Sequence, residues 1–325
     1  MITIVRRSKK RVSVFQWILA TALFTVSCTT DVWNETEDDA NAICFQAPQT
    51  ESRAAVEGSS LPANSSFLVW GGYDNNVTNV FDGETVSEFG GVWNYEGGTR
   101  YWIPGKTYSF YGVYPATLST DKVNVGTDGT ITITDFDCSA TGENAVDLMT
   151  AGSGVMSGTN PSSVTMSFKH LLARVTFVGK IASGTVGIEG FNPIIQSAKL
   201  YGMSKYGSYS SSTSSWQAGV ASTKDEPFAS VTKKKPSVTG ESIIEVLPFP
   251  QAIAGNYFFE VTYSKSENGE TTTQNASLLS LPVLEWKAGY SYQYSFSISV
   301  DDRIIFDTPT VTEWDEAVGG IIIVD

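Results

Sequence analysis

Alternation of apolar and polar residues is the clearest pattern in the chain. Between residues 290 and 300 every second residue is apolar or aromatic, and the residues between them are serine or glutamine. A strict period of two over that length predicts a β-strand with one buried face and one face in water. Residues 257–263 repeat the pattern, with Glu260 and Thr262 on the second face.

Further apolar stretches of strand length lie at residues 67–70, 108–114, 131–136, 164–168, 175–178, 198–201 and 243–247. Glycine, asparagine, aspartate, serine and proline separate them, and these residues favour turns. Short strands joined by such turns predict an all-β fold of antiparallel β-sandwiches. Residues 152–163 are small and polar, with Pro161 near their end, and are the best candidate for a boundary between two domains.

The first 28 residues have the pattern of an export signal. Five basic residues between positions 6 and 11 precede a mostly apolar stretch at 12–26, which is too short and too mixed for a good membrane span. Cys28 follows and resembles the lipidated cysteine of a bacterial lipoprotein, although Thr25 stands where leucine is commonest. An ordinary cleaved signal is the alternative. The acidic residues between 31 and 39 predict a solvated tether.

Charge and cysteine content limit the partners of the chain. The net charge of −13 argues against nucleic acid, because phosphates need a basic surface. The single histidine excludes a zinc site built on two histidines. Two cysteines follow Cys28 and permit one disulfide, but we expect two buried free thiols at Cys44 and Cys138.

The sequence carries no motif of catalysis or cofactor binding. It has no nucleophile elbow, no phosphate-binding loop and no metal-ligand spacing, which predicts a protein that is not an enzyme and needs no cofactor. Composition leaves one enzymatic alternative open, a glycoside hydrolase, since that chemistry needs only two carboxylates. His170 has no second histidine and no cysteine nearby, so we expect it to be structural.

Large aromatic residues gather around the turn at residues 96–98. They are Trp93, Tyr95, Tyr101 and Trp102. Their positions predict a hairpin with cross-strand aromatic pairs in the core, and an exposed platform for sugars is the alternative. We expect loops at the serine-rich residues 207–217 and at the lysine run 233–235.

Four groups of residues, in order along the chain, resemble the fimbrillin family of Bacteroidales pilus subunits. They are 67–73 with 80–83; 91–95 with 100–102, 108–111 and 114–115; 147–151 with 168–175; and 286–292 with 312–314. The resemblance covers nearly the whole chain after Cys28. It implies two β-sandwich domains in tandem, similar to transthyretin-like or immunoglobulin-like folds. The implied division is a signal at 1–27, a tether and pro-strand at 28–53, and sandwiches at 54–158 and 159–325.

The resemblance also implies assembly by strand donation. In such an assembly each subunit lacks one strand, and a strand from a neighbour pairs with the open sheet edge. The isolated apolar pair Ile43 and Phe45 suits the strand that is displaced. The family implies that an arginine-specific protease frees it, and Arg53-Ala54 matches that cleavage position.

The end of the sequence suits a donor strand. Two glycines precede four β-branched residues, Ile321, Ile322, Ile323 and Val324, and such a strand is too apolar to lie in water. It either closes its own second domain or enters the groove of a neighbour. Both possibilities stay open on the sequence.

These observations predict a stalk or accessory subunit of a surface pilus. We expect it to be exported as a lipoprotein, held on the outer membrane by a lipid on Cys28 and joined to other copies or related subunits. An adhesion ligand on a host or bacterial surface is a further expected partner. The alternative is a surface glycan-binding lipoprotein that does not polymerise.

Overall fold

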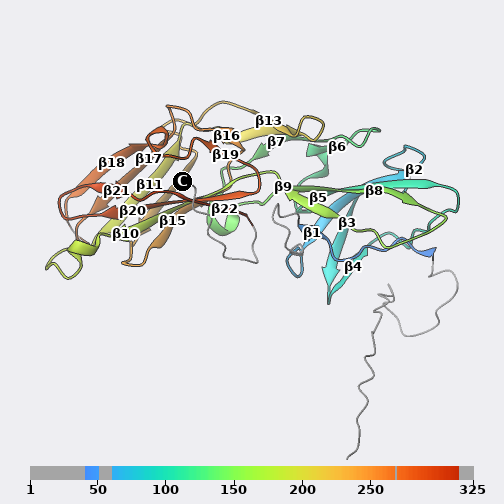
Figure 1. Cartoon of the computed structure of the whole chain (residues 1–325), viewed down its shortest axis with the longest axis horizontal. Helices are drawn as coiled ribbons and strands as arrows, with labels where there is room; N and C mark the ends of the chain where they lie inside the picture. Colours follow the sequence, from blue (N-terminus) through green and yellow to red (C-terminus); the bar gives the residue numbers. More distant parts are fainter. Residues whose placement is uncertain (1–40, 51–60, 268, 315–325) are drawn as a thin grey trace, which may run out of the picture. The chain divides into compact units, whose positions relative to one another are not determined.

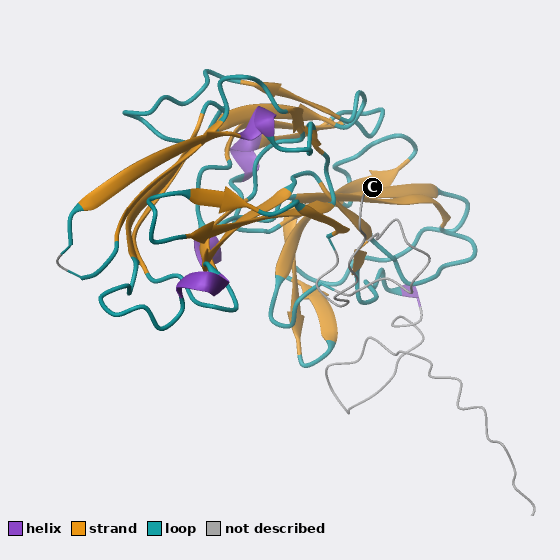
Figure 2. Cartoon of the chain, turned by 60° about the vertical axis from the view of Figure 1, so that its left-hand side comes forward, coloured by secondary structure: helices purple, strands orange, loops and turns teal. Residues whose placement is uncertain are grey.

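Nearly every regular element in the described part of the chain is a β-strand. The computed structural model describes residues 41–50, 61–267 and 269–314. Figure 2 shows strands joined by loops, with only short 3₁₀ helices among them: η2 (Thr120–Lys122), η3 (Gly142–Asn144), η4 (Ser183–Thr185) and η5 (Leu278–Ser280). The predicted all-β class is confirmed. Among the described residues no helix has the length and hydropathy to span a membrane.

The largest sheet has the strand order β1-β9-β8-β5-β2-β3-β4. Its strands are β1 (Gln49–Thr50), β2 (Ser66–Tyr73), β3 (Phe81–Phe89), β4 (Val92–Tyr95), β5 (Thr107–Tyr114), β8 (Met149–Ser157) and β9 (Ser167–His170). Strand β2 lies between β5 and β3 and is buried on both faces. Phe67 and Val69 belong to one hydrophobic core, whereas Leu68 and Trp70 belong to another. This sheet therefore separates two cores.

Two further sheets form a β-sandwich, with the orders β15-β10-β20-β21 and β14-β11-β17-β18 (Figure 1). Strand β22 also pairs with β20. Their strands are β10 (Arg174–Ile181), β11 (Ile194–Tyr201), β14 (Ala229–Lys234), β15 (Glu241–Val246), β17 (Phe258–Ser264), β18 (Thr271–Ser277), β20 (Tyr290–Ile298), β21 (Ile304–Phe306) and β22 (Thr310–Glu313). Phe177 of β10 stacks on Phe259 of β17, with ring centroids 4.2 Å apart. The two sheets thus share an aromatic core.

Strands β10 and β20 run parallel, unlike most neighbours in these sheets. Their register begins at Arg174 opposite Ser291 and ends at Ile181 opposite Ile298. The inward residues of β20 are those that the alternation predicted: Tyr292, Tyr294, Phe296 and Ile298 are all buried. The strict period of two therefore located this strand and its buried face.

Two smaller sheets complete the fold, and one of them joins residues from different halves of the chain. One has the order β13-β12-β7-β6, and the other pairs β16 with β19. Their strands are β6 (Val123–Val125), β7 (Ile131–Asp137), β12 (Tyr206–Ser210), β13 (Ser215–Ala218), β16 (Gln251–Ala252) and β19 (Glu285–Trp286). The described residues all lie within one compact unit. The division into 54–158 and 159–325 stays a prediction.

Three stretches that the sequence predicted as loops contain β-strand residues instead. Residues 152–157, expected in a boundary loop, continue β8 because they pair with β5 as far as Thr107 opposite Ser157. The serine-rich stretch 207–217 holds the hairpin β12–β13, in which Gly207 and Tyr209 are buried. Lys233 and Lys234 end β14 and do not lie in a loop.

The aromatic hairpin turns at a different place from the one expected. Strands β3 and β4 form the hairpin, with Phe89 opposite Val92. Gly90 and Gly91, at φ 61° and 86°, make its two-residue turn, because that turn needs positive φ at both positions. Residues 96–98 follow β4 and do not turn the hairpin.

Candidate assembly site at the N-terminal segment

Residues 41–50, here called the N-terminal segment, place two apolar side chains in the core of the first sheet. Ile43 is 1% exposed and Phe45 is 4% exposed, whereas Asn41 and Gln46 face solvent. Ile43 and Phe45 therefore point the same way, as the alternation of residue types predicted. Their displacement during assembly stays a prediction.

Phe45 sits among four aromatic rings, here called the aromatic cage. The cage consists of Phe67, Phe81, Tyr95 and Phe110, with centroid distances to Phe45 of 5.8, 5.6, 6.1 and 6.3 Å. All four contacts are edge-on, the arrangement that the charge distribution of aromatic rings favours. The cage residues come from β2, β3, β4 and β5, which are four adjacent strands of the sheet.

One flank of the N-terminal segment is hydrogen-bonded to residues 100–102. The amide of Ile43 donates to the carbonyl of Arg100 at 2.8 Å, and the amide of Trp102 donates to the carbonyl of Asn41 at 2.9 Å. Phe45 also forms a bridge with Trp93 of β4. The segment is thus antiparallel to this side of the sheet.

A tyrosine hydroxyl takes the place of one backbone bond on this flank. In an antiparallel pair Arg100 N–H would donate directly to Ile43 C=O. Instead, Arg100 N–H donates to the Tyr95 hydroxyl at 3.1 Å, and that hydroxyl donates to Ile43 C=O at 2.9 Å. Burial raises the pKa of Tyr95, so the hydroxyl keeps its proton at neutral pH.

The opposite flank of the segment is bonded to the other edge of the same sheet. The amide of Gln46 donates to the carbonyl of Val164 at 2.9 Å, and the amide of Val164 donates to the carbonyl of Cys44 at 2.7 Å. Strand β1 then continues parallel to β9. The N-terminal segment therefore lies between β4 and β9, which would be the two edge strands of the sheet without the segment, and it satisfies backbone groups on both flanks.

The space that the N-terminal segment fills between its two flanks is here called the groove. Arg100 fixes the position of the side chains on one wall of it. Its Nε donates to the carbonyl of Val80 at 2.6 Å, and its guanidinium pairs with Glu84. The guanidinium also lies over the rings of Phe81 and Tyr95, 4.7 and 5.3 Å from their centroids. Cation–π contacts of this kind orient both rings of the cage. Sequence reasoning missed Arg100 and the hydroxyl of Tyr95, because no local pattern marks either.

Several predicted site residues lie outside the described part of the chain. They are Cys28, Arg53, Ala54, Ile321, Ile322, Ile323 and Val324. Cys138 is a buried free thiol, so no disulfide joins it to Cys44. Cys44 itself is not free, and the expectation of two free thiols is wrong for that residue.

The aromatic residues near the turn are mostly core residues. Trp93 and Trp102 are buried, whereas Tyr101 is 45% exposed. An exposed sugar platform made of all four residues is therefore excluded. His170 is packed as a structural residue would be: it contacts Asp147 at 2.9 Å and stacks on Trp314 with centroids 4.3 Å apart.

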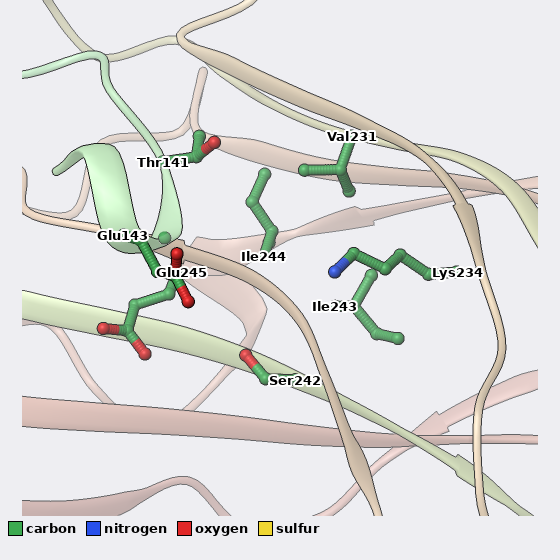
Figure 3. A pocket seen from close by; sticks show the side chains of 9 residues that line it. Thr141, Glu143, Val231, Lys234, Ser242, Ile243, Ile244 and Glu245 are labelled. Carbon is green, nitrogen blue, oxygen red and sulfur yellow. The ribbon is translucent and has the colours of Figure 1, made fainter.

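Two cavities lie elsewhere. Figure 3 shows one of about 400 Å³ whose lining includes Ile243 and Ile244 of β15 and Lys234 of β14. Its Glu245 is already paired with Arg174 at 3.0 Å. The other, of about 580 Å³, is mostly polar. No cluster of three or more potential metal ligands occurs within the described ranges.

Solved structures with the same fold come from Bacteroides species. A candidate cell adhesion protein from Bacteroides ovatus is 18% identical, with a TM-score of 0.57 over 87% of this chain and 98% of that one. A fimbrial protein from Bacteroides vulgatus is 15% identical, with a TM-score of 0.55 over 84% and 99%. A candidate cell adhesion protein from Bacteroides uniformis is 16% identical, with a TM-score of 0.53 over 84% and 98%. At these identities the likeness shows the fold.

The sequence itself matches a family of surface proteins. The fimbrillin-like family model covers residues 52–314, and the chain belongs to that family. No curated protein matches it. Membership supports a role as a pilus subunit at the cell surface. The matched region begins just before Arg53, directly after the N-terminal segment.

Proposed function

We propose that this protein is a stalk or accessory subunit of a surface pilus and that it polymerises by donor-strand exchange. The observation that carries the proposal is the N-terminal segment, which fills a groove between β4 and β9 and bonds to both flanks. Backbone pairing and side-chain packing hold such a strand in the sheet, so it could leave once its covalent connection to the chain is cut. The chain continues from it into residues 51–60, which contain Arg53 and Ala54.

Cleavage after Arg53 would free the segment to leave. Its departure would expose the aromatic cage and leave the carbonyl of Arg100, the amide of Trp102 and both backbone groups of Val164 without partners. Burial of Ile43 and Phe45 contributes about 3–6 kcal/mol, taking about 1.5–3 kcal/mol for each side chain. Open edges of this kind pair with another strand. The emptied groove is therefore an acceptor.

The donor in this proposal is an extended apolar strand from another copy or a related subunit. Ile321 to Val324 supply such a strand. Because one subunit donates at one place and accepts at another, the contact does not close on itself and produces a filament.

Lipidation of Cys28 would hold the exported precursor on the outer membrane before assembly. The acidic residues 31–39 would keep it at a distance from the surface. The finished fimbrium would then support adhesion. A mature chain that retains Cys28 unacylated, whether free or in a disulfide, would contradict this step when measured by mass spectrometry.

Treatment of the purified chain with an arginine-specific protease tests the assembly mechanism. We expect a new terminus at Ala54 by mass spectrometry, followed by ladders that resist SDS. Two variants separate the steps. Arg53→Ala should stay uncut and monomeric, and deletion of residues 319–325 should be cut without forming ladders. Ladders from the deletion variant, or cut wild-type chains that stay monomeric, would refute donation of residues 319–325 between copies of this chain.

A further inference from the structure

The aromatic cage distinguishes between strands that could enter the groove. Each of its four rings meets Phe45 edge-on, with interplanar angles from 62° to 87°. An aliphatic side chain has no ring face or ring edge to offer, so it cannot reproduce these contacts. It is also differently shaped, and tightly packed cores do not rearrange freely to fill a gap.

Tyr95 links the cage to the backbone of the occupant. Its ring is one wall of the cage, and its hydroxyl donates to the carbonyl of Ile43, two residues before Phe45. A slip of one residue would turn the apolar side chains away from the core. A slip of two would keep a carbonyl at Tyr95 but bring a different side chain into the cage. The fit of a side chain in the cage therefore selects between registers that differ by two residues.

We propose that the groove selects an extended segment with an aromatic side chain two residues after the carbonyl bound by Tyr95. This inference rests on the proposed function, since the groove must first be emptied. The run from Ile321 to Val324 contains only isoleucine and valine. The preferred partner of this groove is therefore a different subunit whose donor strand is aromatic at that position, and a second copy of this chain is a poorer match.

Peptide exchange on the cleaved full chain tests the selection. A site-specific protease sequence replaces residues 51–57, the chain is cut there, and fluorescent peptides are added. The parent peptide spans residues 41–50. Variant peptides carry Phe45→Leu, Phe45→Ala or the solvent-facing control Gln46→Ala, and a further peptide spans residues 319–325. Only the peptides differ in this series, so folding of the protein is not in question. Fluorescence anisotropy gives each dissociation constant.

We expect the parent and Gln46→Ala peptides to bind equally. Phe45→Leu should bind about tenfold more weakly, and Phe45→Ala about a hundredfold more weakly. The 319–325 peptide should bind at least about tenfold more weakly than the parent. Tyr95→Phe in the protein should weaken all peptides by a similar factor and leave their order unchanged.

Different contrary results would overturn different parts of the proposal. Equal binding of aromatic and aliphatic peptides would overturn the selection while leaving strand exchange intact. Tighter binding of the 319–325 peptide than of the parent would also overturn it and would favour assembly from identical copies. Failure of every peptide to bind the cut chain would overturn both this inference and the proposed function.

Discussion

Replacement of Phe45 by alanine should release the N-terminal segment from its groove. The side chain is 4% exposed and touches four rings, so alanine would leave a cavity in the middle of the cage. Removing a buried phenylalanine in this way costs about 3–5 kcal/mol. Under the proposed mechanism the segment detaches while the rest of the fold persists, so we expect the loss to appear as local opening.

Hydrogen exchange measures that opening directly. The amides of Ile43 and Gln46 are bonded to the carbonyls of Arg100 and Val164, so they exchange only when the segment leaves. A loss of about 3 kcal/mol corresponds to roughly a hundredfold faster exchange. Mass spectrometry of a peptide covering residues 41–50 would show it, and peptides from β10 and β20 should keep their protection.

The chain supplies a matched control in Phe89. This residue has the same side chain but is 82% exposed at the tip of the β3–β4 hairpin. Phe89→Ala should leave the exchange of the N-terminal segment unchanged. If Phe45→Ala accelerates exchange no more than Phe89→Ala does, the cage does not retain the segment and the reasoning is wrong.

Three further predictions concern the rest of the fold. Burial raises the pKa of Tyr292 from 10 to about 12, so the fold favours the neutral phenol. Its contribution is complete below pH 10 and is lost as the pH rises towards 12; thermal melting should show a smaller alkaline loss for Tyr292→Phe. Burial also raises the pKa of the Cys138 thiol, which should react with a thiol reagent at pH 8 only after urea is added. His170→Ala removes the contact with Asp147 and the stack on Trp314, and should lower the free energy of unfolding by about 1–3 kcal/mol in urea titrations; an unchanged midpoint would contradict it.

Strands with strict alternation could be predicted from the sequence alone. The alternation over residues 290–300 located β20 and its buried face, because Tyr292, Tyr294, Phe296 and Ile298 all point into the core, although Ser295 on the other face is buried as well. The hairpin β12–β13 could not be found in this way. Its residues are mainly serine, threonine and glycine, and its position is set by pairing with β7, far away in the sequence. Pairing across such distances leaves no local signature.

The candidate site likewise contains some features that the sequence predicts and others that it does not. Ile43 and Phe45 were predicted to face one way because their alternation is local. The groove that receives them could not be predicted, since Arg100, Tyr95 and Val164 come from separate parts of the chain. An arginine beside a glycine-rich turn has no distinctive sequence pattern. Only the fold shows that its carbonyl pairs with Ile43.

The parallel pairing of β10 with β20 has a consequence for biosynthesis. The strands of the first sheet all precede residue 171, so this sheet can form soon after His170 has been synthesised. One edge of β10 can pair with β15, but its other edge must wait for residues 291–298, which follow much later in the sequence. Closing so long a loop is slow, and the waiting apolar strand is prone to aggregate. A chaperone that receives the newly made chain should therefore bind the stretch around Val175 and Phe177 for longer than any strand of the first sheet.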